Sequence, residues 1–289
     1  MWKMVNFIIH AMLPILLNFF LLISMCLGIN AHNALAENKP NKIISLSPSL
    51  TEILFAIGAV SQVIAVDSQS NYPKNAPRTR LSAYEPNLEA IASFKPDLVV
   101  LSYDISDAVK GLNLVGIDTL LLPTPKDFSE ILKQIMVLGE STGNIKKANK
   151  LVIDMEDKMR RLTAVREKRR PIKIYHEIDE NYYSPSSFSF IGSIYQMLNL
   201  TNIADSADKG GYGYPKLSPE YIISSNPDII ILPGRNSSYI GKLMQRPGWK
   251  HISAVKNKKF LRVEPDVASR WGPRVPEFAN SIVGFLESN

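Results

Sequence analysis

Cysteine and histidine, the side chains that most often bind transition metals or form cross-links, are scarce in this chain of 289 residues. Cys26 is the only cysteine, so the chain can form no internal disulfide and no paired-cysteine metal site. Of the four histidines, only His176 and His251 lie beyond residue 32, which is too few for a three-histidine metal site. A packed core must therefore stabilise the fold, and a hydrophobic content of 45% is typical of globular proteins that have one.

The motifs of common catalytic and nucleotide-binding sites are also missing. The chain contains no His-Glu-x-x-His motif, no phosphate-binding loop and no Gly-x-Ser-x-Gly turn. The glycines at 210, 211 and 213 precede a Tyr-Pro turn, so they do not form a dinucleotide-binding fingerprint. A Ser–His–acid triad built on His176 is arithmetically allowed, which keeps a secreted hydrolase as a distant alternative to a non-enzymatic protein.

The charge of the chain does not indicate a nucleic-acid partner. The formal net charge is +6, and the basic residues are spread along the chain apart from one cluster near Arg160–Arg170. Binding to nucleic acid would require a basic patch interleaved with aromatic residues, or a recognised module, and the sequence has neither.

The N-terminus predicts export from the cytoplasm. Lys3 precedes a long apolar run, Phe7–Ile29, and the small-x-small sequence Ala34-Leu35-Ala36 suits signal peptidase. We therefore assign residues 1–36 to a leader, although the run is just long enough to serve as a membrane anchor instead.

The position of Cys26 at the end of the apolar run resembles the lipoprotein signal of bacterial surface proteins, in which the cysteine is acylated. Met25 departs from that signal, because a small residue normally occupies its position. Two alternatives follow: lipidation at Cys26, or an unmodified cysteine in a leader that is cleaved after Ala36.

From residue 42 onward, short apolar segments alternate with amphipathic ones. This alternation predicts a parallel sheet covered by helices on both faces. The predicted strands are 43–46, 63–66, 98–101, 119–122, 172–175, 229–232 and 260–263. The predicted helices begin at the capping residues Ser49, Asn87 and Ser218 and also cover 108–115, 128–138, 190–200 and 275–286.

Two segments of the chain repeat each other. Residues 89–101 and 220–232 share Glu, Ile, Ser, Pro, Asp and Leu in register, 131 positions apart. Each segment predicts a short helix that starts with an acid, a Pro-Asp turn and a buried strand. A unit that occurs twice indicates two similarly built α/β lobes, and two such lobes create a cleft between them.

A long amphipathic helix separates the two repeats. Its apolar stripe runs without glycine or proline from Asn144 to Arg169, which corresponds to nearly 40 Å. This length favours a rigid connector over an ordinary crossover within one sheet. The predicted organisation is an N-terminal lobe at 42–143, a connecting helix at 144–170 and a C-terminal lobe at 171–289.

Several sequence blocks in a fixed order resemble the substrate-binding proteins of ATP-driven importers for cobalamin, iron–siderophores and heme. The blocks are Ile43–Leu54, Asn71-Tyr72-Pro73, Asn87-Leu88-Glu89 with Lys95-Pro96-Asp97, Ser187–Ile203 and Gly272-Pro273-Arg274. The resemblance covers the mature chain and is greatest to the compact cobalamin-binding type. It implies two Rossmann-like lobes with parallel sheets, joined by one backbone helix, the class III arrangement of helical-backbone metal receptors.

The resemblance assigns Glu89 and Glu220 to docking on the membrane permease. In the family, one glutamate at the tip of each lobe inserts between permease arginines, with which a carboxylate can form bidentate pairs. An acid in a first helical turn also stabilises the helix dipole, which is the structural alternative for each residue.

The resemblance also implies a ligand site in the cleft, made of aromatic side chains and a few polar groups. The matching positions are Tyr84, Tyr103, Tyr183, Tyr214, Asp266 and Arg270. Several positions that carry tryptophan or phenylalanine in cobalamin binders are tyrosine here. Tyrosine stacks on a flat macrocycle equally well but adds a hydroxyl that can hydrogen-bond or ligate ferric iron.

Roles for four residues complete this hypothesis. Trp271 is assigned to the cleft wall or to the core, Arg270 to pairing with a ligand carboxylate or phosphate, and Arg274 to bracing the start of the last helix. His176 ends a strand near the expected cleft and is either an axial ligand to cobalt or iron or a hydrogen-bonded structural histidine.

Together these features predict an exported, monomeric substrate-binding component of an importer with no intrinsic cofactor. The expected ligand is a cobalt corrinoid, with a ferric siderophore or heme as alternatives, and the expected partner is a permease dimer with its cytoplasmic ATPase. The connecting helix predicts only modest motion of the lobes.

Overall fold

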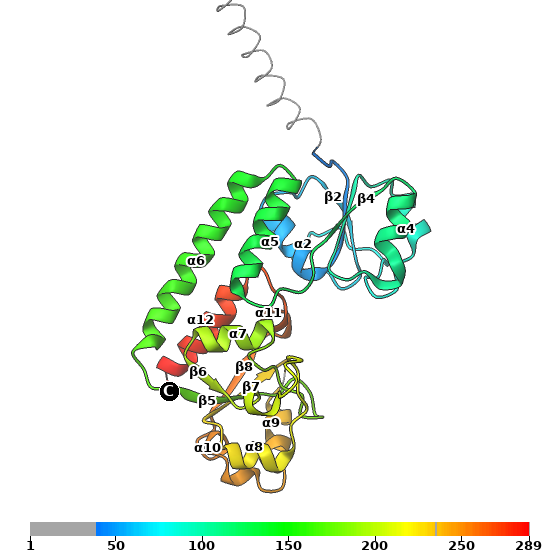
Figure 1. The fold of residues 1–289 in the computed structure, drawn as a ribbon. Coiled ribbons are helices and arrows are strands. Elements are labelled where there is room, and N and C mark those ends of the chain that lie inside the picture. Colours follow the sequence, from blue (N-terminus) through cyan, green and yellow to red (C-terminus); the bar gives the residue numbers. More distant parts are fainter. Residues whose placement is uncertain (1–38, 235, 289) are drawn as a thin grey trace, which may run out of the picture. The chain divides into compact units, whose positions relative to one another are not determined.

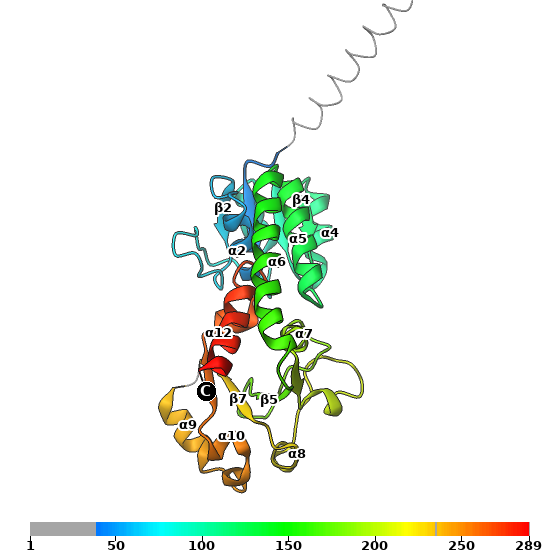
Figure 2. The ribbon, with the colours of Figure 1, turned by 90° about the vertical axis from the view of Figure 1, so that its left-hand side faces the viewer.

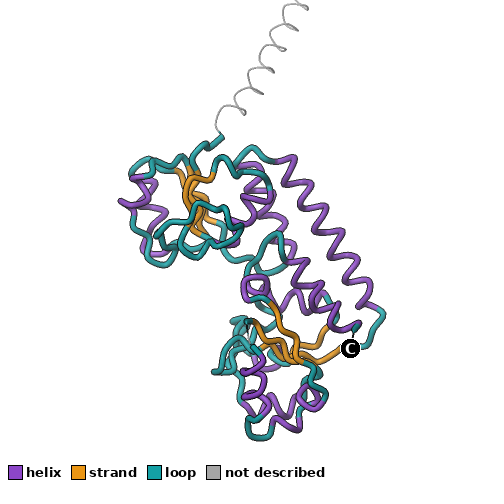
Figure 3. Tube along the Cα trace, turned by 180° about the vertical axis from the view of Figure 1, so that it is seen from behind, coloured by secondary structure: helices purple, strands orange, loops and turns teal. Residues whose placement is uncertain are grey.

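The computed structural model describes residues 39–234 and 236–288, so the predicted leader 1–36, its cleavage site and Cys26 lie outside the described residues. Residues 41–289 form one compact unit. Within it the strands make two separate four-stranded sheets, and every pair of neighbouring strands is parallel (Figure 1; Figure 3). The prediction of two α/β lobes with parallel sheets is confirmed.

The N-terminal lobe is built around the first sheet, in which the strand order is β2-β1-β3-β4. Its strands are β1 (Ile43–Leu46), β2 (Val63–Val66), β3 (Leu98–Leu101) and β4 (Asp118–Leu121). Its helices are α2 (Pro48–Ala56), α3 (Leu88–Ser93), α4 (Ala108–Leu114) and α5 (Phe128–Ser141), with the 3₁₀ turn η1 (Ile105–Asp107).

The C-terminal lobe has the equivalent strand order β6-β5-β7-β8. Its strands are β5 (Ile172–His176), β6 (Leu200–Asn202), β7 (Ile229–Pro233) and β8 (Phe260–Val263). Its helices are α7 (Phe190–Met197), α8 (Pro219–Ser225), α9 (Ser237–Met244), α10 (Ser253–Lys256), α11 (Pro265–Ser269) and α12 (Val275–Glu287), with η2 (Asp205–Ala207) and η3 (Trp249–His251).

The repeated Pro-Asp turn has the same structural role in both lobes. Oδ2 of Asp97 accepts a hydrogen bond from the Lys42 backbone N–H at 2.9 Å, and Oδ2 of Asp228 accepts one from Lys173 at 2.9 Å. Each aspartate therefore holds the start of the central strand of its sheet. The residue directly before each Pro-Asp turn has a left-handed backbone, with φ near 50° at both Lys95 and Asn226. The sequence repeat thus reflects a repeated set of backbone contacts.

Helix caps explain where the helices before the central strands begin. The side chains of Asn87 and Ser218 accept hydrogen bonds from the backbone of Ala90 and Tyr221, so both predicted caps are confirmed. The predicted cap Ser49 is wrong. Ser47 caps α2 instead, because Pro48, which lacks a backbone N–H and has a fixed φ, suits the first helical position.

The long helix α6 (Ile145–Glu167) confirms the predicted amphipathic helix to within two residues at each end. Its 23 residues correspond to about 35 Å. It packs along α5 of the N-terminal lobe and along α12 of the C-terminal lobe (Figure 2). Met155 and Met159 on its apolar stripe are buried in a core cluster that includes residues of both sheets. The helix therefore shares one hydrophobic core with both lobes.

The second lobe contains elements that the sequence did not predict. The helix expected at 190–200 ends at Met197, because Asn199 takes a left-handed backbone (φ 52°), and the short strand β6 follows. Helices α9, α10 and α11 were also missed; two of the three are no longer than five residues, so their periodicity is too brief to detect. Within the described residues, none of the helices combines the length and apolar character needed to cross a membrane.

Candidate functional site

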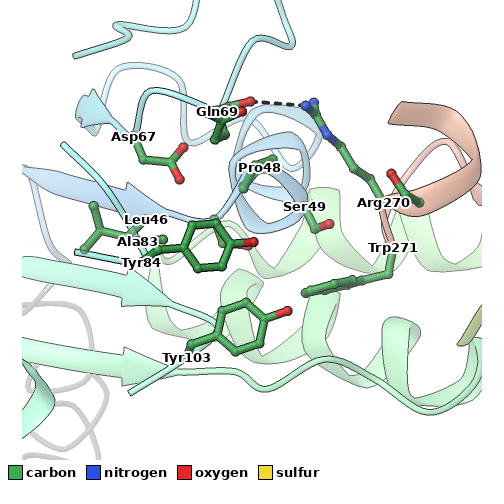
Figure 4. Close-up of a pocket in the computed structure, with 12 residues that line it drawn as sticks. Leu46, Pro48, Ser49, Asp67, Gln69, Ala83, Tyr84, Tyr103, Arg270 and Trp271 are labelled. Carbon is green, nitrogen blue, oxygen red and sulfur yellow. Dashed lines mark hydrogen bonds between the residues drawn. The ribbon is translucent and has the colours of Figure 1, made fainter. Parts of the chain in front are cut away.

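A cavity of about 340 Å³ lies beyond the carboxyl ends of the strands of the N-terminal sheet (Figure 4). This edge is where open α/β sheets bind their ligands, and the volume is within the usual range for small-molecule sites. Segments after β1, β2 and β3 form one side, and the end of α11 forms the other. The lining residues are Leu46, Ser47, Pro48, Ser49, Asp67, Gln69, Ala83, Tyr84, Tyr103, Ser269, Arg270 and Trp271.

Three aromatic residues from the predicted site line this cavity. The rings of Tyr84 and Tyr103 stack with centroids 6.2 Å apart and planes inclined by 27°, and both side chains are exposed. Trp271 lies opposite them and is largely buried, and its Nε1 has no hydrogen-bond partner (Figure 4). The cavity thus offers aromatic surfaces on two sides for a flat ligand.

Buried hydroxyl groups fix the loops beneath the cavity. Thr51 donates a hydrogen bond to the Oγ of Ser45 at 2.8 Å and lies 3.0 Å from the Oγ of Ser70. Ser102 donates to the Oγ of Ser47 at 2.8 Å. These neutral groups hold the strand ends without placing a charge in the core, so the loops above them are preorganised.

Asp67 is a buried acid in the wall of the cavity, directly after β2. Its Oδ1 accepts a hydrogen bond from the Ser70 backbone at 2.9 Å. Burial raises the pKa of Asp67, while the hydrogen bonds from Ser70 and the positive charge of Arg270 act in the opposite direction. Asp67 was not among the site residues predicted from the sequence. Its position immediately after a buried strand, at the edge where ligands bind, was the available signal.

Glu52 joins the two lobes through two arginines. It is buried in α2 of the N-terminal lobe, and its carboxylate accepts hydrogen bonds from Arg270 at 3.0 Å and from Arg274 at 2.5 and 2.8 Å. The Arg274 guanidinium also stacks over the Tyr72 ring, 4.3 Å from its centroid. Burial lowers the pKa of Arg274, but its hydrogen bond to Glu52, the leading cause, raises it overall.

Two further polar residues complete this contact. Asn71 donates to Asp266 at 3.0 Å and accepts from Arg270 at 2.8 Å, and Arg270 also pairs with Asp266 at 3.1 Å. We name Glu52, Asn71, Asp266, Arg270 and Arg274 the cross-lobe cluster. Asp266 is therefore placed beside the cavity as an internal partner of Arg270.

Two aspartates shape the loops of the C-terminal lobe that carry Tyr214. Asp208 is buried and accepts hydrogen bonds from the Ser186 hydroxyl at 2.5 Å and from the backbone of Tyr212 and Gly213 at 2.9 and 2.7 Å. Burial alone would raise the pKa of Asp208, but these hydrogen bonds outweigh it and lower the pKa. Asp205 accepts from the Ser187 backbone and hydroxyl in the same way.

Exposed aromatic side chains gather on these loops. Tyr183, Phe188, Tyr212 and Tyr214 are all exposed, Tyr212 at 89%. Burial of its hydroxyl region raises the pKa of Tyr214, and the nearby Tyr103 of the other lobe adds to that rise. Tyr183 and Tyr214 are not among the residues that line the cavity. Phe188 and Tyr212 were not predicted from the sequence, because they lie in loops without periodicity.

His176 does not line the cavity. It is 1% exposed at the end of β5, and its Nδ1 lies 2.6 Å from the Tyr195 hydroxyl. Burial lowers the pKa of His176 to about 3, so the ring is neutral at physiological pH. This environment matches the structural alternative and gives a cleft ligand no access to the ring. Within the described residues, no group of three His, Cys, Asp or Glu side chains is arranged to hold a metal ion.

The two predicted docking glutamates occupy equivalent places. Glu89 lies in the first turn of α3 and Glu220 in the first turn of α8, and both are exposed. Neither forms an ion pair with another described residue. Both carboxylates are therefore accessible from solvent on the first turns of rigid helices.

Comparison with protein-family models gives one match, to a family described as periplasmic binding protein, over residues 43–267. Among relatives, an uncharacterised ABC transporter substrate-binding lipoprotein, YvrC of Bacillus subtilis, is 32% identical over 262 residues, which cover 85% of this chain and 81% of YvrC. A vitamin B12-binding protein of Vibrio cholerae is 24% identical over 85% of this chain and 89% of its own length.

Among solved structures, the fold is similar to that of a possible iron-binding (periplasmic solute-binding) protein from Staphylococcus epidermidis. The TM-score is 0.76 with 26% sequence identity, and the match covers 86% of this chain and 99% of that one.

Proposed function

The chain belongs to the periplasmic binding protein family, and we propose that it captures a metal chelate outside the cytoplasm and delivers it to an ABC importer. Capture and release require no covalent chemistry, so the protein acts as a binding component and not as an enzyme. The ligand that the site fits best is a cobalt corrinoid. Heme and ferric siderophores are the alternatives, supported by the tyrosine hydroxyls at the cleft, which can ligate ferric iron.

One observation carries this proposal. The cavity lies at the carboxyl edge of the N-terminal sheet and also contacts the C-terminal lobe, and stacked Tyr84 and Tyr103 face the buried Trp271 across it. Aromatic faces on both sides of a cavity suit a flat, largely apolar ring system. Tyr183 and Tyr214 extend the aromatic surface from the second lobe, and we assign them to ligand contact as well.

Delivery requires a surface that the permease recognises. Glu89 and Glu220 supply it in our proposal, because two exposed carboxylates on the first turns of equivalent helices can each pair with arginines of a two-fold permease. The permease works with its cytoplasmic ATPase, and the binding protein itself is a monomer.

We assign the lobes to residues 42–143 and 171–289, with 144–170 as the connecting helix. The leader 1–36 directs export, and acylation of Cys26 is one way in which the protein stays at the membrane surface. The cross-lobe cluster and α6 restrict lobe motion to a modest closure. Structures with and without ligand test this restriction, and a large rotation of one lobe would contradict it.

The proposed function is tested by titrating the purified protein with cyanocobalamin, hemin and ferric siderophores while tryptophan fluorescence is recorded. Trp271 lines the cavity, so a bound chelate quenches its emission. The expected result is saturable binding of at least one chelate. Turnover of chromogenic ester, phosphate or glycoside substrates without any chelate binding would favour the hydrolase alternative.

The docking assignment has a separate test. The double change Glu89→Ala and Glu220→Ala is expected to abolish uptake by cells and to leave chelate affinity in solution unchanged. Glu85→Ala with Glu180→Ala, two acids outside the first turns of α3 and α8, provides a matched control that retains uptake. A large loss of affinity in the docking variant would contradict the assignment.

A further inference from the structure

Charged groups in the wall of the cavity are few. Of the twelve lining residues, only Asp67 and Arg270 carry a charge. Asp67 lies on the same side as Tyr84, and Arg270 lies opposite, next to Trp271 (Figure 4). The electrostatic preference of the site therefore depends on which of these two charges is available to a ligand.

The charge of Arg270 is already used inside the protein. One terminal nitrogen donates to Glu52 at 3.0 Å and to Asn71 at 2.8 Å. The other donates to the Gln69 carbonyl at 3.1 Å and pairs with Asp266 at 3.1 Å. A guanidinium has five N–H donors, of which four belong to the terminal nitrogens. Arg270 has no free pair of donors for a ligand carboxylate, contrary to the role expected from the sequence.

The charges next to the cavity do not cancel. Glu52, Asp67 and Asp266 are three acids, whereas Arg270 and Arg274 are two bases, and both arginine side chains are 11% exposed. With all five ionised, the group carries one net negative charge. The two arginines pair with Glu52 and Asp266, so Asp67 is the acid whose charge has no direct partner in this group.

We infer that the cleft selects chelates without net negative charge and that Asp67 is the residue that sets this preference. This inference rests on the proposed binding function and narrows its ligand class. The field of Asp67 repels the carboxylates of heme or ferric citrate, and the cavity wall has no free cation to compensate for it.

A neutral ring system with peripheral amides fits the remaining polar groups. An amide N–H of the ligand can donate to the carboxylate of Asp67 in the cavity wall. A corrinoid rich in amides meets this requirement, and its ring system can stack on Tyr84. Its charge and its hydrogen-bonding groups are thus complementary to the cavity.

The test uses ligands and variants that differ in one charge. The purified protein and its Asp67→Asn variant are titrated with cyanocobalamin, with the monocarboxylic acid made by hydrolysing one peripheral amide, and with hemin and ferric citrate. The wild-type protein is expected to bind the acid about tenfold more weakly than cyanocobalamin. The Asp67→Asn variant is expected to reduce that penalty to about threefold or less.

Asp118→Asn is the matched control, because Asp118 is an exposed acid at the opposite end of the same sheet, and it retains the wild-type penalty. If Asp67→Asn does not fold, a salt series on the wild-type protein decides the question, since the penalty must shrink as salt screens it.

The outcomes separate the two proposals. Tighter binding of hemin or ferric citrate than of cyanocobalamin, or an equal penalty in Asp67→Asn and wild type, overturns the charge preference and leaves the importer function in place. No binding of any of the four ligands or of the ferric siderophores overturns the proposed function and the charge preference together.

Discussion

The two lobes share one backbone plan but differ at the carboxyl ends of their central strands. β1 and β5 have the same neighbours in the same register: Ser45 lies opposite Val100, and His176, at the equivalent position, lies opposite Ile231. The backbone at this edge is therefore the same in both lobes. The side chains at the strand ends determine whether the edge stays open or is filled.

In the N-terminal lobe, small neutral groups occupy the strand end. Thr51 bonds to Ser45 and Ser70, Ser45 and Ser102 both donate to Ser47, and a cavity remains above this buried hydroxyl network. Short side chains satisfy each other's hydrogen bonds without filling the space, which leaves this edge open to a ligand.

In the C-terminal lobe, large charged and aromatic groups fill the same edge. Glu177 is fully buried, pairs with Arg246 at 2.6 Å and accepts from the hydroxyls of Tyr175 and Tyr239. The Arg246 guanidinium also lies 4.5 Å from the Trp249 ring centroid. Burial and the charge of Glu177 raise the pKa of Tyr175, so its hydroxyl stays protonated as a donor. This lobe uses its strand end for stability, and we assign ligand contact in this lobe to its loops.

The largest expected effect comes from breaking the charged strand end. Glu177→Gln leaves Arg246 without its carboxylate partner and is expected to lower the free energy of unfolding by about 3–5 kcal/mol. Urea unfolding measures this change. Chelate affinity should be unaffected at temperatures where the variant is folded, because Glu177 is outside the cavity.

The control for Glu177→Gln is Asp157→Asn, which removes a surface pair with Arg160 and is expected to cost less than about 1 kcal/mol. Equal losses of unfolding free energy in the two variants would contradict the larger contribution that we assign to the buried pair.

His176 should make stability depend on pH. Its pKa is about 3 in the folded protein against a usual 6.5, so the unfolded chain binds the proton more readily. Stability is fully present above pH 6.5 and falls at lower pH by about 1.4 kcal/mol per unit, roughly 2–3 kcal/mol by pH 4.5. His176→Gln should flatten this part of the curve, and His251→Gln, at an exposed site, should not. A slope unchanged in His176→Gln would assign the pH dependence to other groups.

Asp208→Asn tests whether the loops of the second lobe are preorganised for binding. Replacing the carboxylate weakens three hydrogen bonds and is expected to cost about 1–3 kcal/mol of stability. Because the loop carries Tyr214, chelate affinity should also fall severalfold, as measured by fluorescence titration. Unchanged affinity would show that the loop does not contribute to the site.

The smallest effect is expected in the neutral network. Ser102→Ala removes one hydrogen bond to Ser47 and is expected to cost about 1 kcal/mol by urea unfolding. Asn113→Ala, at an exposed hydrogen bond with Thr119, is the control and should cost less. If Ser102→Ala lowered the free energy of unfolding as much as Glu177→Gln does, the proposed contrast between the neutral and the charged strand end would be wrong.

Much of the fold was predictable because its signals are local. Period-two and apolar segments located seven of the eight strands, and caps such as Asn87 and Ser218 located helix starts. The strand β6 was missed because it begins at Leu200, directly after the left-handed residue Asn199 and three residues after the end of α7, so its start was taken for the end of the helix. The cap at Ser49 was predicted wrongly because serines lie on both sides of Pro48. Proline favours the first helical position, so the serine before it is the cap.

The site was predictable only in part. Tyr84, Tyr103 and Arg270 were selected by resemblance and Trp271 by its place beside Arg270, and all four line one cavity. The free or paired state of Arg270 depends on Glu52, which precedes it by more than two hundred positions, and no local pattern joins the two. The burial of His176 against Tyr195 is likewise a long-range contact.

The sequence alone determined the repeated α/β plan, the long connecting helix and the two equivalent glutamates, because periodicity, caps and turn residues act over a few positions. Only the tertiary structure decided which charges neutralise one another and which strand end stays open. Those outcomes depend on side chains that meet across the fold, where burial and distance set the strength of each interaction.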